Sequence, residues 1–227
     1  IYEAMSHFDV RNEYSKQMGE ALAVSADGAI LAEIAKLAVE QKENITGLGK
    51  GVILDKQIDA TDMGITEAEG KMIVQMLLEL KAKFSNQYVP ATERYVYMKP
   101  DGVAALVASW NAINRDFGAV GTLADGNVTK IAGFNIIEVP HLTDGGADGT
   151  HVLRSGTAHD FPSTYKDKCV FVAAHHTAVG TVKLKDLAVE TGRRIEYQAT
   201  QLVAKYSMGH GGLRPEATAI GCISAKG

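Results

Sequence analysis

The segment from Tyr2 to Gln41 contains no proline and is rich in Ala, Leu, Glu, Met and Lys. Because these residues favour helix and proline disrupts it, the segment predicts one long helix or two in tandem. Its only weak points are Gly19 and Gly28.

Apolar residues recur at every fourth position of this segment: Val10, Tyr14, Met18, Leu22, Ala26, Ile30, Ile34 and Ala38. Four residues advance about 40° beyond a full helical turn, so this ridge winds around the helix instead of staying on one side. Different parts of the helix are therefore expected to bury different faces, as in a strut that crosses several neighbours, some of them in other subunits. The alternative is a long helix that is kinked near Gly28, and the sequence does not decide between the two.

The middle of the chain alternates between extended and helical patterns. Val52 to Leu54 form a short apolar run among glycines, which predicts a strand. Thr66 and Glu69 have the spacing of a capping box, in which the hydroxyl and the carboxylate satisfy free backbone N–H groups. The helix that follows carries one apolar face, made of Met72, Ile73, Met76, Leu77, Leu80 and Phe84.

A second strand and helix follow. Arg94 to Met98 predicts a strand, and Pro100 with Asp101 starts a helix. Its inward-facing residues are expected to be Val103, Leu106, Val107 and Trp110. Gly126 to Val139 predicts a hairpin or strand pair, and the whole stretch is typical of a compact α/β domain.

The last third of the chain is predicted to be mostly extended. His141 to Lys168 is dense in Gly, Asp, Thr and Ser and too long for a simple turn, so we expect an excursion over the surface. Cys169 to Ala174 is an unbroken apolar run, which predicts a strand covered on both faces. The alternation from Thr200 to Met208 predicts a half-buried strand. Gly209 to Gly212 is predicted to turn the chain, with Ala217 to Ile223 returning beside that strand.

The composition excludes several classes of function. The 227 residues are 46% hydrophobic, enough for one or two globular domains. Lys and Arg total 23 against 27 Asp and Glu, so a surface that wraps nucleic acid is not expected. No apolar run approaches the roughly 20 residues that span a bilayer. Ile1 opens a charge-dotted segment, so we expect no signal peptide and infer that residues have been lost in front of it.

Three motifs resemble ligand-binding loops, and each fails on its context. Gly47 to Gly51 lacks the Ser or Thr of a phosphate loop, and Gly209 to Gly212 lacks the spacing of a dinucleotide fingerprint. Asp144 to Gly149 resembles the opening of a calcium loop, but Ser155 stands where a bidentate Glu is required. Tight turns and a solvated loop are the expected alternatives.

Histidines offer the other candidate metal ligands. His175 and His176 suggest a pair, but neighbours on a strand point to opposite faces and cannot close on one ion. The loop from His141 to Lys168, called the histidine loop below, could in principle assemble a metal site, although its spacing matches no ligand pattern. The residues concerned are His141, His151 and His159 with Asp144, Asp148 and Asp160.

The remaining reactive residues favour structural roles. There is no Gly-x-Ser-x-Gly motif, and Cys169 and Cys222 lie in apolar strands that disfavour a thiolate. These two cysteines cannot form a disulfide framework and suggest a reducing compartment. Glu67 and Glu69 lie at a helix start, where the dipole accounts for them. Arg193, Arg194 and Arg214 are expected in intersubunit ion pairs or in solvent. We predict no catalytic, cofactor-binding or metal residue.

Six further segments of the chain form a recognisable set: Ala4 to Arg11, Ala26 to Ala35, Tyr88 to Ala91, Glu138 to Leu142, Ala178 to Leu184 and Ala204 to Ala217. In this order along the chain, they closely resemble the major capsid protein family of T-seven-like short-tailed bacteriophages. The resemblance implies an α+β fold of the HK-ninety-seven type, with a peripheral domain, a long spine helix and an α/β axial domain. It implies that the N-terminal arm and extended loop are missing, so this stretch alone is expected to assemble poorly.

The resemblance also implies a domain division and a function. Residues 1–65 would form the peripheral domain with the spine helix, 66–178 the axial domain, and 179–227 long strands that return to the peripheral domain. The loop from His141 to Lys168 would lie on an outer face or near a capsomer axis. The implied function is a non-enzymatic major capsid protein, a subunit of the pentamers and hexamers of an icosahedral head around double-stranded DNA.

The implied partners are further copies of the chain, a scaffolding protein, a portal, and genomic DNA without sequence-specific binding. No membrane and no cofactor are expected. The implied location is the virion, with assembly in the cytoplasm of a bacterial host. Two alternatives stay open: an encapsulin-like nanocompartment shell, and a small metal-dependent α/β enzyme that uses the histidine loop.

Overall fold

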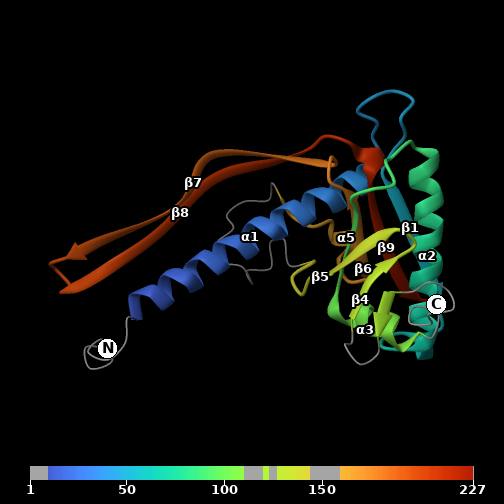
Figure 1. The fold of residues 1–227 in the computed structure, drawn as a ribbon, viewed down its shortest axis with the longest axis horizontal. Helices are drawn as coiled ribbons and strands as arrows, with labels where there is room; N and C mark the ends of the chain where they lie inside the picture. The colour runs from blue at the N-terminus through green and yellow to red at the C-terminus, as the bar shows by residue number, and fades with distance from the viewer. Residues whose placement is uncertain (1–9, 110–119, 123–126, 144–158, 227) are drawn as a thin grey trace.

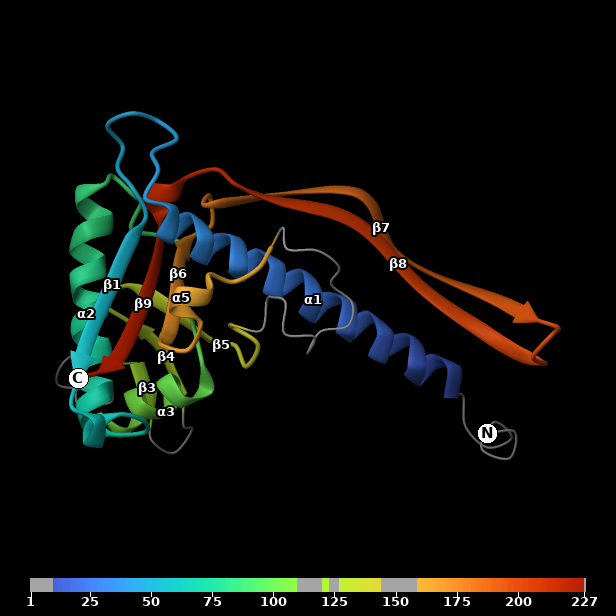
Figure 2. The same cartoon turned by 180° about the vertical axis from the view of Figure 1, so that it is seen from behind.

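The computed structural model describes residues 10–109, 120–122, 127–143 and 159–226. Three parts are visible in Figure 1: a body built on a sheet, a long helix α1 that runs out of this body, and a hairpin of β7 and β8 that extends in the same direction as α1. Figure 2 shows the same arrangement from behind. The predicted positions of Trp110 and of residues 144–158 lie outside the described residues.

Helix α1 is one continuous helix, Val10–Glu40, so the prediction of one long helix is confirmed and the alternative of two tandem helices is wrong. Its second half packs into the body, where Leu31, Ile34 and Ala38 are buried. From residue 12 to residue 24 the described side chains are all exposed or half-buried, and Tyr14 is 50% exposed. The apolar ridge is therefore covered by this subunit only at its C-terminal end. No described helix is both long and apolar enough to cross a membrane.

A seven-stranded sheet forms the centre of the body, with strand order β1-β9-β6-β2-β5-β4-β3. Its strands are β1 (Val52–Ile58), β2 (Arg94–Met98), β3 (Val120–Thr122), β4 (Asn127–Ile131), β5 (Phe134–Glu138), β6 (Cys169–His175) and β9 (Thr218–Ala225). The pairs β1–β9 and β2–β5 are parallel, and the others are antiparallel. The prediction that β6 is covered on both faces is confirmed, because six of its seven residues are buried.

Helices cover the two faces of this sheet. Tyr95 and Tyr97 of β2 line a small cavity with Ile30 and Ile34 of α1. On the opposite face the Arg94 guanidinium lies over the rings of two phenylalanines, one of which belongs to α2. Because successive residues of a strand point to opposite faces, α1 and α2 lie on opposite sides of the sheet. The remaining elements are α2 (Glu67–Asn86), α3 (Pro100–Ala108), α5 (Ser163–Lys166) and the short turns η2 (Ala60–Asp62) and η4 (Pro215–Ala217).

The hairpin is a separate two-stranded sheet of β7 (Val179–Arg194) and β8 (Ala199–Gly212). The predicted turn at Gly209–Gly212 is wrong, because these residues belong to β8 and pair with the start of β7. A side chain at Gly212 would overlap Leu37 of α1, so the close approach of this helix explains the glycine. The final strand β9 pairs with β1 and β6, and not with β8 as expected.

Strands from all three predicted domain ranges meet in one sheet. β1 comes from residues 1–65, β6 from 66–178 and β9 from 179–227, and β9 lies between the other two. The division at residues 65 and 178 stays a prediction.

The predicted capping box at the start of α2 is half confirmed. The Thr66 hydroxyl accepts a hydrogen bond from the Glu69 backbone N–H at 3.2 Å. The Glu69 carboxylate, however, accepts from the backbone N–H of Gly64 at 2.6 Å, not from that of Thr66. Burial raises the pKa of Glu69. The acidic pair of the sequence, Glu67 and Glu69, is therefore part of a helix start, with Glu67 paired to Lys71 at 2.8 Å.

Gly70 allows α2 and α3 to pack closely, and Gly70→Ala is expected to disrupt that packing. A methyl group there would overlap the backbone carbonyl of Ala105 and the side chain of Ser109. We expect a loss of about 1–3 kcal/mol in the free energy of unfolding, as for other overpacked cores. Urea unfolding followed by circular dichroism measures it.

Gly19→Ala is the matched control. Gly19 is also helical, but nothing lies within 4 Å of an added methyl group. This variant should gain up to about 1 kcal/mol from the better helix propensity of alanine. Equal effects of the two substitutions would contradict the predicted contact between α2 and α3.

Candidate intersubunit surface

The hairpin carries most of its large apolar side chains in solvent. Those more than 40% exposed are Val182, Leu184, Leu187, Val189, Ile195, Tyr197 and Val203. Ile195 and Tyr197 lie in the turn at its tip. A two-stranded hairpin is marginally stable in water by itself, and contiguous exposed apolar surface marks interaction sites. This surface is called the hairpin surface below.

One side of β8 is partly covered within the subunit. Leu202, Ala204, Tyr206 and Met208 are half-buried, while Val203 and Lys205 between them are exposed. This confirms the predicted half-buried strand, and β8 packs against α1. Every residue of β7 beyond Gly180 is exposed. The hairpin is therefore supported on one side by the long helix and is open on the other.

The hairpin is positively charged relative to the rest of the chain. Residues 179–212 contain five basic and three acidic residues, a net charge of +2. The whole chain carries −4, so the remainder carries −6. Two ion pairs lie within the hairpin, Lys183 with Asp186 and Lys205 with Glu190. The two arginines near the tip, Arg193 and Arg194, are exposed as predicted.

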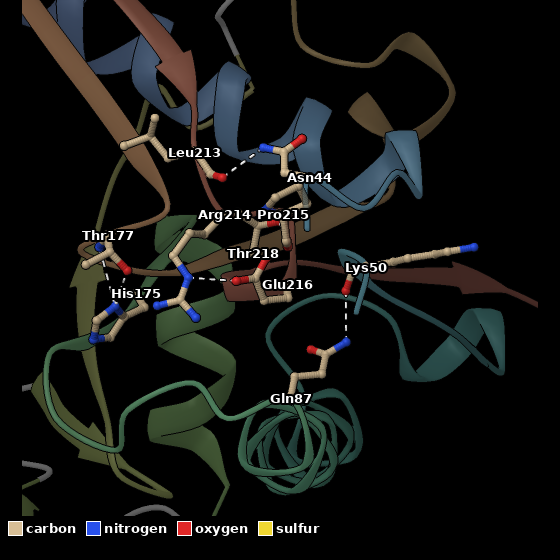
Figure 3. Close-up of polar contacts among 10 residues, drawn as sticks. All are labelled: Asn44, Lys50, Gln87, His175, Thr177, Leu213, Arg214, Pro215, Glu216 and Thr218. Carbon is tan, nitrogen blue, oxygen red and sulfur yellow. Dashed lines mark hydrogen bonds and ion pairs between the residues drawn. The ribbon is translucent and has the colours of Figure 1, made fainter. Parts of the chain in front are cut away.

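Hydrogen bonds fix the root of the hairpin to the body. The backbone carbonyl of Ala178 accepts from the N–H groups of Leu213 and Arg214 at 2.9 and 3.2 Å. The Asn44 amide donates to the carbonyl of Leu213 at 2.8 Å (Figure 3). The Arg214 guanidinium donates to the Glu216 carboxylate at 2.6 Å, and Glu216 is only 2% exposed. The expected role of Arg214 in an intersubunit pair or in solvent is therefore corrected to a partly buried pair within the chain.

The adjacent histidines His175 and His176 lie at the same root of the hairpin. The prediction that their side chains point to opposite faces of a strand is wrong. His175 is the last residue of β6 and is 3% exposed, whereas His176 lies in the turn that follows. Because the strand ends between them, their rings come together, with centroids 4.4 Å apart. His176 Nδ1 is 2.9 Å from Glu93 Oε2. Burial and then the neighbouring charge of His176 lower the pKa of His175.

The other candidates from the sequence have structural roles where they are described. The glycines between 47 and 51 lie in the connection from α1 to β1, where the Lys50 carbonyl accepts from Gln87 at 2.9 Å (Figure 3). Cys169 and Cys222 are free, buried and paired in register across β6 and β9. A hydrogen bond with Cys222, followed by burial, raises the pKa of Cys169 well above its usual range, so its thiolate is disfavoured as predicted.

The histidine loop is described only in part. His159 lies 3.4 Å from Glu33 of α1, with its ring 5.7 Å from that of His210. His151 and the calcium-like stretch from Asp144 to Gly149 lie outside the described residues. The hairpin surface was not predicted from the sequence, because the prediction of an alternating strand covered β8 and not β7.

The fold is that of tailed-phage capsid proteins. The chain is similar to a chain in the capsid structure of the cyanophage P-SCSP1u, with a TM-score of 0.79 and 30% identity over 99% of this chain and 69% of that one. It is also similar to a chain of the mature capsid of bacteriophage PhiM1, with a TM-score of 0.77 and 18% identity over 98% of this chain and 68% of that one. The predicted HK-ninety-seven-type fold is confirmed.

Sequence comparisons give the family. The family model Gp10A-like, described as major capsid protein, matches residues 1–221, and the chain therefore belongs to this family. It is 43% identical to the major capsid protein of Escherichia phage T7 and 44% identical to that of Enterobacteria phage T3. Each alignment covers 96% of this chain and 66% of the relative. The chain thus spans just under two thirds of the length of these curated relatives.

Proposed function

We propose that this chain is the shell-forming part of a major capsid protein, and that many copies of it build an icosahedral phage head. Family membership supports this role, and the observation that carries it is the hairpin surface. A lone two-stranded hairpin with exposed apolar side chains gains stability when a partner covers it. A shell offers such a partner in every neighbouring subunit.

The occupant of the hairpin surface is a second copy of this chain. The hairpin carries +2 and the rest of the subunit −6, so a neighbouring body attracts the hairpin. The uncovered first half of α1 offers another open apolar ridge. Contacts between different patches of identical subunits close into rings, which accounts for pentamers and hexamers.

The contents and assembly partners follow from the same role. The proposed contents are double-stranded genomic DNA without sequence-specific contacts, because a net charge of −4 suits a container that DNA must enter and leave. A scaffolding protein and a portal are the proposed assembly partners, and the bacterial cytoplasm is the proposed place of assembly. The proposed division of the subunit keeps residues 66–178 as axial domain between the two peripheral ranges.

A structural role is proposed over catalysis. The family is one of capsid proteins. Among the described residues, the Glu69 carboxylate belongs to a helix start and His159 lies beside Glu33. An encapsulin-like compartment is less well supported, because the related proteins are phage capsid proteins.

Electron microscopy of the full-length product, expressed together with its scaffolding protein, tests the proposal. We expect closed shells or capsomer-like rings. Soluble monomers under all assembly conditions would contradict the proposed shell-forming role.

A further inference from the structure

Three side chains at the root of the hairpin gather donor atoms typical of a zinc site. One ligand atom from each of Glu93, His175 and His176 lies within 4.8 Å of the other two. Two atoms bound tetrahedrally to one zinc ion lie about 3.3 Å apart, and the carboxylate oxygen of Glu93 is already 2.9 Å from Nδ1 of His176. We propose that these three side chains bind one divalent transition metal ion of the zinc type.

His175 provides the second, independent observation. It is almost completely buried, yet its Nε2 atom has no hydrogen-bond partner among the described residues. Its Nδ1 atom lies 2.8 Å from the hydroxyl of Thr177 and accepts a longer hydrogen bond, of 3.4 Å, from the Thr177 backbone N–H (Figure 3). Histidines that bind metal typically donate a hydrogen bond from the other ring nitrogen, which fixes the tautomer and the ring orientation. When Nδ1 donates to the Thr177 hydroxyl, it gives up the longer contact with the Thr177 backbone N–H, and Nε2 is then the atom left for the metal.

The register of the sheet explains why the three ligands meet. β2 and β6 are antiparallel, with Arg94 opposite His175. One step beyond this pair, Glu93 precedes β2 and His176 follows β6, so their side chains lie beside each other at the same end of the sheet. Three ligands from the protein leave a fourth position for water, since the side chains of Glu93 and His176 are both more than half exposed.

The positive charges of two guanidinium groups would repel a metal ion bound at His175. Arg94 and Arg214 both act electrostatically on His175. Each is already engaged, because Arg94 donates to two backbone carbonyls and Arg214 pairs with the buried carboxylate of Glu216. The carboxylate of Glu93 brings a further negative charge into the site itself.

A metal ion here would connect the start of β2 to the short link between the sheet and the hairpin. Residues 176–178 are the whole of that link. Their attachment to Glu93 would limit the directions that the hairpin can take from the body. Zinc should therefore slow hydrogen exchange of the backbone amides of the link.

Zinc titration of the purified protein by calorimetry near neutral pH tests the site. We expect one zinc ion per chain. Thr177→Val, which removes only the orienting hydroxyl, should weaken binding about 10- to 100-fold. His176→Gln and Glu93→Gln each remove a ligand and should weaken it at least as much. Both side chains are half exposed, so these variants should fold, and thermal melting without metal checks this.

His210→Gln is the matched control, because His210 lies on β8 outside the cluster. This variant should bind zinc as the unmodified protein does. The proposal is overturned if no saturable binding occurs at micromolar zinc. It is equally overturned if His176→Gln binds normally, or if His210→Gln is the variant that loses binding. None of these outcomes depends on whether the protein forms shells.

Discussion

The double variant Val182→Asp/Leu184→Asp should fold as a subunit but fail to form shells. The two side chains are 76% and 80% exposed, so their replacement should change the free energy of unfolding by no more than about 0.5 kcal/mol each. If the hairpin surface is covered by a second copy, each contact would instead bury two unpaired carboxylates, at a cost of several kcal/mol. Because the contact recurs throughout a shell, assembly should be lost. Gradient sedimentation and electron microscopy after co-expression with the scaffolding protein measure this.

Leu78→Asp provides the control for this experiment. Leu78 lies on α2 and is 54% exposed, so the chemical change is the same but lies off the hairpin. This variant should still assemble. Normal shells from the hairpin variant would show that the hairpin surface is not an intersubunit contact, and normal thermal melting would exclude misfolding as the cause of lost assembly.

Arg214→Met should cause the largest loss of subunit stability, about 3–5 kcal/mol. The substitution removes the guanidinium that lies 2.6 Å from the Glu216 carboxylate. Glu216 is 2% exposed, so its charge would be left in the protein without its partner. Urea unfolding of the subunit measures the loss.

The double variant Arg214→Met/Glu216→Gln separates the charge from the packing. Because this variant has no unpaired buried carboxylate, most of the lost free energy of unfolding should be recovered. Replacement of a buried ion pair by uncharged side chains is often close to neutral. A loss below about 1 kcal/mol for Arg214→Met alone would mean that water reaches Glu216 and that the root of the hairpin is more open than described.

Elements defined by local signals could be predicted from the sequence. The strand Arg94–Met98 and the helix that starts at Pro100 were predicted at their observed positions. In the helix after Thr66 the predicted apolar face is the buried one, apart from Met72, which is half-buried. Each of these depends on the residues inside the element, such as a cap, a proline at the first turn or a repeat of apolar positions.

Elements defined by distant neighbours could not be predicted. Gly212 was assigned to a turn because glycine is common in turns, whereas here it makes room for Leu37, far away in the sequence. Glu93 joins His176 only through the pairing of β2 with β6. The ridge of α1 predicted several neighbours, but which part each covers became clear only from the body that buries its second half.

A cryo-electron microscopy reconstruction of the assembled full-length protein tests the central claim most directly. The account predicts closed shells in which the hairpin of each subunit, from Val179 to Gly212, packs against a neighbouring copy and buries Val182 and Leu184. Shells in which the hairpin surface faces solvent in every subunit would contradict it, as would the absence of shells.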